Sequence, residues 1–173
     1  MTRKSEAMLT PDHLSRTAIV YIRQSSGFQV RNNVERRRLQ YELVSHARGL
    51  GFSRVEVIDD DLGVPSNGIH REGYERLLTA VCNKSVGLVL AIEASRLARG
   101  GSDWHMLLEF CAIVGCLVGD RERLYDPAVA DDRAYLGVLC RIRHSNPYVV
   151  QVFMSGSDRN HLAARNFSRN CPT

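Results

Sequence analysis

Lysine is scarce in this sequence of 173 residues, and long apolar runs and paired cysteines are missing from it. The longest nearly uncharged run, residues 110–119, is too short to cross a bilayer, which takes about 20 apolar residues. No apolar block of the kind found in secretory signals follows the polar N-terminus. We therefore expect a cytoplasmic protein without a membrane partner.

The five cysteines are odd in number and include no Cys-x-x-Cys pair, so the sequence predicts neither a disulfide framework nor a zinc site. Cys82 and Cys111 lie in apolar segments with helical spacing, and we expect both to be buried thiols. The six histidines lack the paired spacing of a metal site. We expect no metal site.

Arginine makes up 21 of the 23 basic residues, and the formal net charge is +4. The planar guanidinium pairs with phosphate through two hydrogen bonds, which the lysine ammonium cannot do. High genomic GC content also raises arginine over lysine. Composition alone therefore makes nucleic acid a candidate partner and no more.

Apolar runs alternate with helical periodicities through the middle of the chain. Strands are expected at residues 17–22, 54–59, 86–92, 116–119 and 123–125. Helices are expected at residues 33–50, 72–83 and 102–114, and a further helix starts at 131–143. This order predicts an α/β fold in which a mostly parallel central sheet carries helices on both faces.

Both ends of the chain differ in character from the middle. Residues 1–16 are polar and without a period, and they predict a flexible arm. Residues 17–143 form the expected α/β domain. Pro147 cannot continue the last helix, so we expect a truncated helix followed by an irregular, poorly ordered tail over residues 144–173.

Three polar clusters follow strands of the predicted sheet, at residues 23–29, 59–71 and 95–99. In an open parallel sheet, ligands bind beyond the carboxyl ends of the strands. We therefore expect the three clusters to converge on one site.

Residue types in the first and third clusters suit phosphate chemistry. Arg23 and Ser25 are two apart, so extended backbone points them the same way, as attack of a hydroxyl on a phosphate requires. Arg96 and Arg99 share a helical face at a helix start, where the helix dipole disfavours cations unless an anion binds. The alternative for each pair is a solvated loop or helix start with surface arginines.

Together these residues resemble the serine recombinase family, the resolvases and invertases. The family pattern Tyr-x-Arg-x-Ser with a later Gln is matched by Tyr21, Arg23, Ser25 and Gln29. An Arg-Glu-Gly before a helix is matched by Arg71, Glu72 and Gly73. The signature Asp-Arg-Leu-x-Arg is matched by Ser95, Arg96, Leu97, Ala98 and Arg99, with Ser95 in place of Asp. The resemblance covers residues 17–139 and is greatest to phage-type and transposon-type recombinases.

The resemblance implies a resolvase-like catalytic domain that cuts and rejoins DNA. Ser25 would attack a DNA phosphodiester and hold the broken 5′ end as a phosphoserine, without metal or cofactor. Gln29 would orient substrate or nucleophile. The arginines that would stabilise the charge on the phosphate are Arg23, Arg71, Arg96 and Arg99. The implied partners are double-stranded DNA and further copies of the chain, as a homodimer and, if a full-length form exists, as a tetramer in synapsis.

Several points stay open in the sequence. No general base is assigned, and Asp59 and Asp61 are candidates either for orienting the arginines or for simple loop ion pairs. Ser95 departs from the family Asp, and Glu93 is a possible substitute for that carboxylate. The run Arg36–Arg38 suits a solvated helix face or a contact with the DNA backbone.

Two other functions compete with this interpretation. The family likeness stops near Leu139, which suggests a truncated or frameshifted remnant that only binds DNA or intact recombinase. A flavodoxin-like domain for a small ligand is the third hypothesis, but no glycine-rich phosphate loop follows the first strand.

We expect Trp104 to be a core residue, together with Leu107, Leu108 and Cys111.

Overall fold

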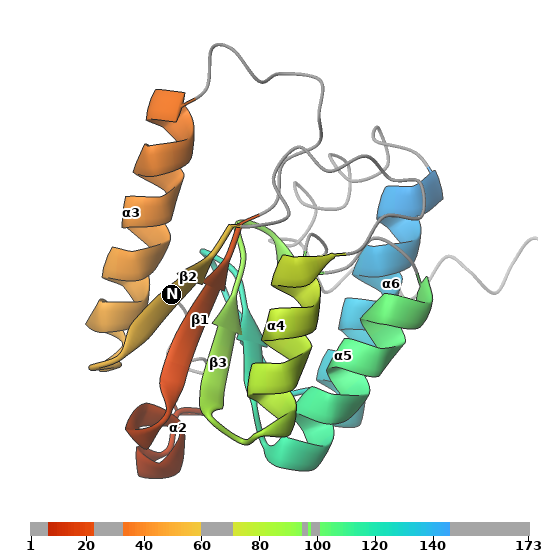
Figure 1. The fold of residues 1–173 in the computed structure, drawn as a ribbon. Helices are drawn as coiled ribbons and strands as arrows, with labels where there is room; N and C mark the ends of the chain where they lie inside the picture. The colour runs from red at the N-terminus through yellow and green to blue at the C-terminus, as the bar shows by residue number, and fades with distance from the viewer. Residues whose placement is uncertain (1–6, 23–32, 60–70, 95–96, 98–100, 146–173) are drawn as a thin grey trace, which may run out of the picture.

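The computed structural model describes residues 7–22, 33–59, 71–94, 97 and 101–145. Five strands form one sheet in the order β2-β1-β3-β4-β5. They are β1 (Thr17–Tyr21), β2 (Val55–Ile58), β3 (Val86–Leu90), β4 (Leu117–Gly119) and β5 (Leu124–Tyr125). Strands β1 to β4 are parallel, and β5 returns antiparallel to β4 (Figure 1). The predicted mostly parallel sheet is confirmed.

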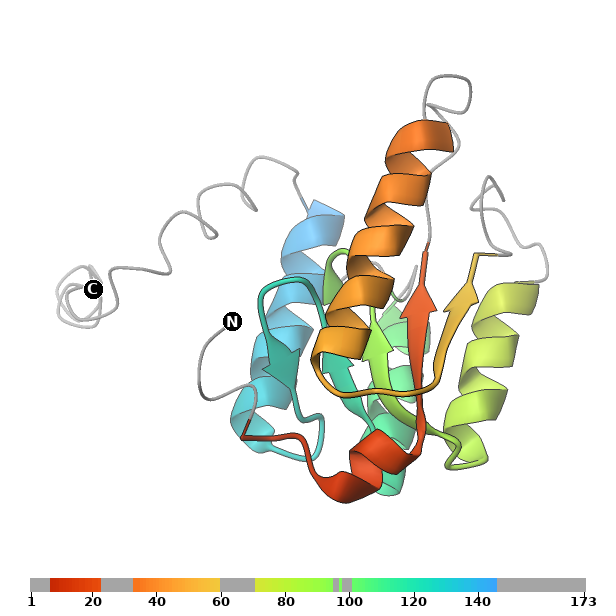
Figure 2. The same cartoon turned by 90° about the vertical axis from the view of Figure 1, so that its left-hand side faces the viewer.

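Helices cover both faces of the sheet. They are α2 (Pro11–Ser15), α3 (Asn33–Gly49), α4 (Glu72–Cys82), α5 (Gly101–Val114) and α6 (Ala130–Ser145). Helix α3 lies on one face, while α4, α5 and α6 lie on the other (Figures 1 and 2). The result is the three-layer α/β arrangement that the sequence predicts, with helix and strand boundaries close to the expected ones.

The position of β3 in the middle of the sheet explains why its sequence is apolar throughout. All five of its residues are buried, because a helical layer covers each face. Val86 and Val89 belong to the core beneath α4 and α5, whereas Leu88 and Leu90 belong to the core beneath α3. The predicted core position of Trp104 is confirmed, since its side chain is only 1% exposed.

The N-terminal segment differs from the predicted flexible arm, because Pro11–Ser15 form the helix α2. Thr10 caps it: its hydroxyl accepts from the His13 backbone N–H, and its own N–H donates to the His13 ring nitrogen at 3.1 Å. Leu14 packs against the core beneath α3. A five-residue helix is too short to show a period in the sequence, which is why only its cap could reveal it. Residues 1–6 lie outside the described residues.

One cysteine prediction is confirmed and the other is wrong. Cys111 is buried, but Cys82 is exposed. Cys82 is the last residue of α4 and follows the buried Val81, so it lies about 100° further round the helix, away from the sheet.

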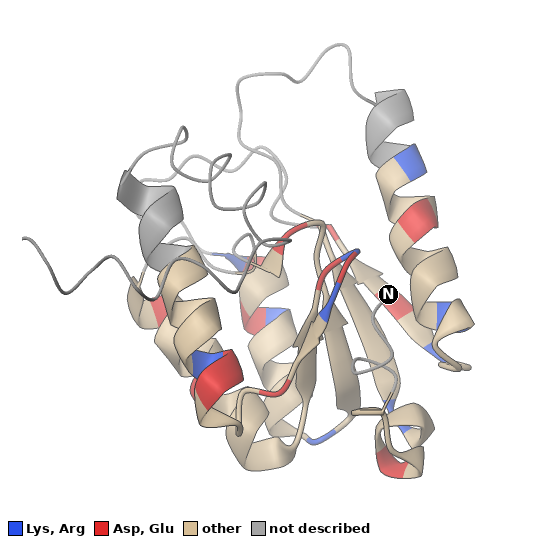
Figure 3. Ribbon diagram, turned by 180° about the vertical axis from the view of Figure 1, so that it is seen from behind, with Lys and Arg blue, Asp and Glu red and all other residues tan. Residues whose placement is uncertain are grey.

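Charged residues avoid the central strands. Figure 3 shows them on the helices, on β2 and at the turn between β4 and β5. Strands β1, β3 and β4 contain no charged residue. None of the helices in the described ranges combines the length and apolar character needed to cross a membrane.

Candidate functional site

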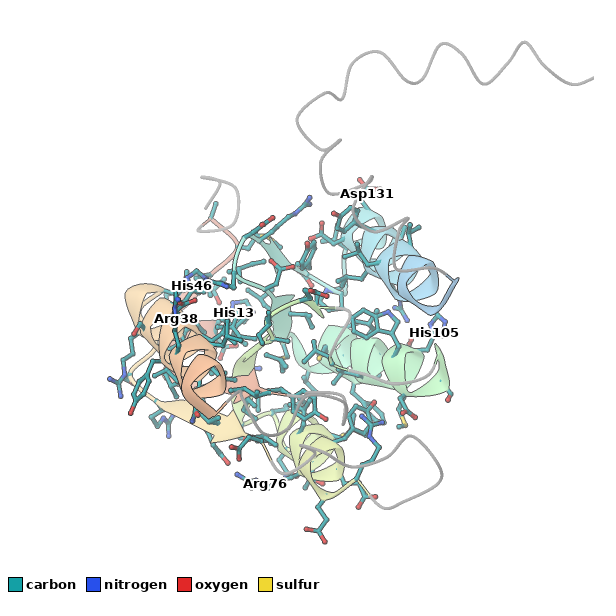
Figure 4. The ribbon with its side chains drawn as sticks, turned by 90° about the horizontal axis from the view of Figure 1, so that it is seen from above. His13, Arg38, His46, Arg76, His105 and Asp131 are labelled. Carbon is teal, nitrogen blue, oxygen red and sulfur yellow. The ribbon has the colours of Figure 1, made fainter. Side chains whose placement is uncertain are left out.

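The three strands that precede the polar clusters are neighbours in the sheet. Strand β1 lies between β2 and β3, with Tyr21 opposite Ile58 and Val20 opposite Leu90. All three run in the same direction, so they end at one edge, which Figure 4 views from above. This carboxyl edge is where we place the candidate site.

Most of the candidate residues lie outside the described residues. These are Arg23, Ser25, Gln29, Arg96 and Arg99, together with Asp61 and Ser95. Arg71 is described, as is Tyr21 of the first motif, which is buried in the core beneath α4 and α5. The convergence of the six predicted site residues therefore stays a prediction.

Arg71 lies at the start of α4, at the N-cap position, and makes two well-defined contacts. Its Nη1 donates to the Asp103 carboxylate, which lies in the first turn of α5. Its guanidinium also lies over the Tyr74 ring, with 4.2 Å between the guanidinium carbon and the ring centroid. The Arg71 side chain is only 13% exposed, so its charge is held among protein groups rather than in open solvent.

Tyr74 ties this arrangement together. Its hydroxyl donates to the backbone carbonyl of Asp103, so the ring that supports Arg71 is fixed at its far end to α5. Burial, followed by the negative charge of Asp103, raises the pKa of the Tyr74 hydroxyl well above its usual value. The hydroxyl therefore stays protonated, and remains a donor, throughout the physiological pH range.

The sequence analysis assigned no polar role to either Asp103 or Tyr74. The three residues Arg71, Tyr74 and Asp103, which we call the Arg71 cluster, are joined across two helices. Only the i,i+3 spacing of Arg71 and Tyr74 on α4 was visible in the sequence. The position of Asp103 in a helix first turn gave no sign of its partner.

Two further carboxylates lie near the carboxyl edge. Asp59 directly follows β2 and Glu93 lies three residues beyond β3. Both are half-buried and both take part in polar or electrostatic interactions. Asp59 stays a candidate for orienting the arginines or for a simple loop ion pair, and Glu93 stays a candidate substitute for the family carboxylate. Within the described residues, no three His, Cys, Asp or Glu side chains gather as a metal-binding group.

A second polar surface lies on the opposite side of the sheet. An open cavity of about 600 Å³ there is lined by Arg38, Tyr41, Glu42, Ser45, His46 and Arg121. The Glu42 carboxylate accepts from Arg38 at 2.9 Å and also from Arg121, so it links α3 to the β4–β5 turn. Figure 4 shows Arg38 and His46 together on α3. Arg71, which is the predicted site residue that the structure describes, does not line this cavity.

The sheet order and the position of the helices define an α/β domain, with the candidate site at the carboxyl edge of the parallel strands. A family model described as "Resolvase, N terminal domain" matches residues 18–143. The chain therefore belongs to the resolvase family of serine recombinases, as an N-terminal domain of that family.

The chain is also similar in sequence to part of a longer curated protein. The chain is 40% identical over 152 residues to the uncharacterized protein y4bA/y4pH of Sinorhizobium fredii (strain NBRC 101917 / NGR234). The match covers 86% of this chain but 22% of that protein, so the chain spans about a fifth of its relative.

Two crystal structures share the fold. One is the N-terminal catalytic domain of TP901-1 integrase, with a TM-score of 0.53 and 20% identity, covering 75% of this chain and 95% of that one. The other is a resolvase family site-specific recombinase from Streptococcus pneumoniae, with a TM-score of 0.57 and 19% identity, covering 81% of this chain and 95% of that one. These similarities confirm the predicted resolvase-like fold.

Proposed function

We propose that this domain cuts and rejoins DNA strands, with Ser25 as the nucleophile. The observation that carries the proposal is the position of Arg71. It lies at the start of α4, and α4 follows β2 at the edge where β1 leads into Arg23 and Ser25. Strand β3, on the other side of β1, leads toward Arg96 and Arg99. The order of the strands therefore favours a meeting of all these groups at one phosphate.

The proposed reaction is two successive transesterifications. The Ser25 oxygen attacks the phosphorus of a DNA phosphodiester, a new P–O bond forms to serine, and the bond to the 3′ oxygen breaks. The serine proton leaves to a base that is not assigned, and the 3′ oxygen takes up a proton. In the second step a 3′ hydroxyl attacks the phosphoserine, the strand is resealed and Ser25 regains its hydroxyl. Bond energy is conserved, so no nucleotide cofactor is required.

Arginines supply the charge stabilisation in this proposal. Phosphoryl transfer depends mainly on positioning and on stabilising the negative charge of the transition state. Arg23, Arg71, Arg96 and Arg99 carry that positive charge, and Gln29 orients the substrate or the nucleophile. Removal of one such donor typically costs a factor of about 10²–10³ in rate.

The partner in this proposal is double-stranded DNA, bound by a homodimer that pairs into a tetramer during synapsis. The competing hypothesis is a remnant that binds DNA or intact recombinase without cutting. The two hypotheses differ in one measurable product, a covalent bond between protein and DNA.

The test looks for that bond without requiring a known recombination site. The chain is incubated with a pool of duplexes of random sequence, the DNA is digested with nuclease, and the protein is analysed by mass spectrometry. We expect a nucleotide attached to Ser25, absent in Ser25→Ala and retained in Ser26→Ala, which is the matched control. A nucleotide still present in Ser25→Ala contradicts the assigned nucleophile. Salt-dependent DNA binding with no attached nucleotide in any variant favours the non-catalytic remnant.

A further inference from the structure

We propose that Asp103 and Tyr74 are positioning residues, which hold the guanidinium of Arg71 in the orientation that receives the DNA phosphate. The proposal rests on the function proposed above and adds two residues to its machinery. It starts from the Arg71 cluster, whose three members come from α4 and α5.

The position of Arg71 creates the need for support. It lies at the N-cap of α4, where the helix dipole is positive, and its side chain makes no capping hydrogen bond. Little of the side chain reaches solvent. A guanidinium in these surroundings is unfavourable unless a counter-charge lies beside it.

Asp103 supplies that counter-charge from a different helix. It lies in the first turn of α5, where the helix dipole favours a carboxylate. It accepts from Nη1 of Arg71, and its own side chain is one-third exposed. The ion pair thus fixes one edge of the guanidinium relative to α5.

Tyr74 fixes the plane of the guanidinium. Its ring lies against Arg71, one helical turn further along α4, and the whole residue is 4% exposed. Its hydroxyl is held by the Asp103 backbone carbonyl, so the ring cannot swing away from Arg71 without breaking that hydrogen bond. Trp104, the neighbour of Asp103, is buried in the core and anchors this turn of α5.

The combination matters for phosphate chemistry because the arginine fork recognises phosphate through its geometry. One contact fixes an edge of the guanidinium and the other fixes its plane, so a phosphate oxygen meets its donors in one orientation. Preorganised donors of this kind stabilise a transition state without having to reorganise during the reaction. The Asp103 charge also opposes tight binding of phosphate in the ground state.

These roles predict opposite effects on binding and on reaction. Asp103→Asn keeps the shape of the side chain but removes its charge. The rate of nucleotide attachment to Ser25 should fall at least about tenfold, because small misplacements of a reacting group are costly. Affinity for a DNA duplex should stay equal or rise. Asp103→Glu, which restores the charge, should recover part of the rate.

The matched control is Glu109→Gln, since Glu109 lies on the same helix and pairs with Arg133 on α6. It should leave both the rate and the affinity within about twofold of the original chain. If Asp103→Asn reacts as fast as Glu109→Gln, the positioning role is refuted. A loss of DNA affinity in Asp103→Asn that parallels its loss of rate refutes that role as well.

Tyr74 is tested by separating its ring from its hydroxyl. Tyr74→Phe keeps the ring and loses the bond to the Asp103 carbonyl, while Tyr74→Leu loses both contacts. We expect a graded loss of rate, larger for Tyr74→Leu, with thermal unfolding measured alongside. Equal rates in both variants and in the original chain exclude a role for Tyr74.

A readout independent of activity separates this proposal from the function on which it rests. The side-chain N–H signal of Arg71 in ¹⁵N NMR is assigned as the signal that is missing from the spectrum of Arg71→Lys. The rate at which the Arg71 guanidinium rotates is then measured. Rotation should be slow in the original chain and in Glu109→Gln, and fast in Asp103→Asn. If the original chain forms no covalent adduct with DNA but the three rotation rates are as expected, the proposed recombinase function is refuted. The positioning of Arg71 by Asp103 is then still supported. Equal rotation rates in the original chain, Glu109→Gln and Asp103→Asn refute the positioning of Arg71 by Asp103.

Discussion

Arg123 donates to Asp132 at 3.1 Å, which joins the end of the β4–β5 turn to the first turn of α6. The second Asp132 oxygen accepts from the backbone N–H of Asp126 at 2.9 Å. The Arg123 guanidinium also lies over the rings of Tyr125 and Tyr135, which stack with their centroids 5.6 Å apart. Asp132 thus lies at the centre of the contacts that dock α6 onto the sheet.

We predict that Asp132→Ala destabilises the domain by about 2–3 kcal/mol, because a partly buried backbone N–H and a charged partner both lose their acceptor. Urea unfolding monitored by circular dichroism measures the change. The matched control is Asp131→Asn, one residue earlier in α6 and exposed (Figure 4). It should change stability by no more than about 0.5 kcal/mol. Equal effects of the two substitutions contradict the docking role of Asp132.

Gly87 provides a test of how α2 packs beneath the sheet. A Cβ at this position of β3 would lie 2.2 Å from the backbone carbonyl oxygen of His13. Backbone cannot move aside as a flexible side chain can, so Gly87→Ala should destabilise the domain by about 1–3 kcal/mol. Thermal or urea unfolding measures this loss.

Gly137 on α6 is the control for Gly87, because a Cβ there meets no atom within 4 Å. Alanine has the higher helix propensity, so Gly137→Ala should raise stability by about 0.5–1 kcal/mol. A neutral Gly87→Ala would mean that α2 does not pack against β3 in solution.

The sheet could be predicted from the sequence because its signals are local. Val86–Leu90 forms a continuous apolar run, as a strand covered on both faces requires, and Leu43 and Ala47 have the spacing of one buried helix face. Each signal needs only neighbouring residues. The α/β class therefore followed from these local patterns and from their order along the chain.

Contacts between elements could not be predicted in the same way. The pair of Arg71 and Asp103 joins residues 32 positions apart, and it depends on how α4 packs against α5. The exposure of Cys82 depends on which side of α4 faces the sheet. The meeting of Ser25 with the arginines is a relationship of this same kind, and it stays a prediction.

His46 gives the domain a predicted dependence on pH. It lies on α3, half-buried, and its Nε2 is buried without a hydrogen-bond partner among the described residues. Burial lowers the pKa of His46 below its usual 6.5, and the Arg121 charge acts in the same direction while Asp120 opposes it. The unfolded chain therefore binds a proton at His46 more readily than the folded chain does.

Stability should consequently be lost as the pH falls below about 6.5 toward the lower pKa of the folded state. We predict that His46→Gln reduces this loss, since glutamine takes up no proton in this range. Urea unfolding between pH 7.5 and 5.5 measures it, with His105→Gln on the exposed side of α5 as the matched control (Figure 4). If His46→Gln and the original chain lose the same stability on acidification while the His46 signals titrate normally in NMR, burial does not control this histidine.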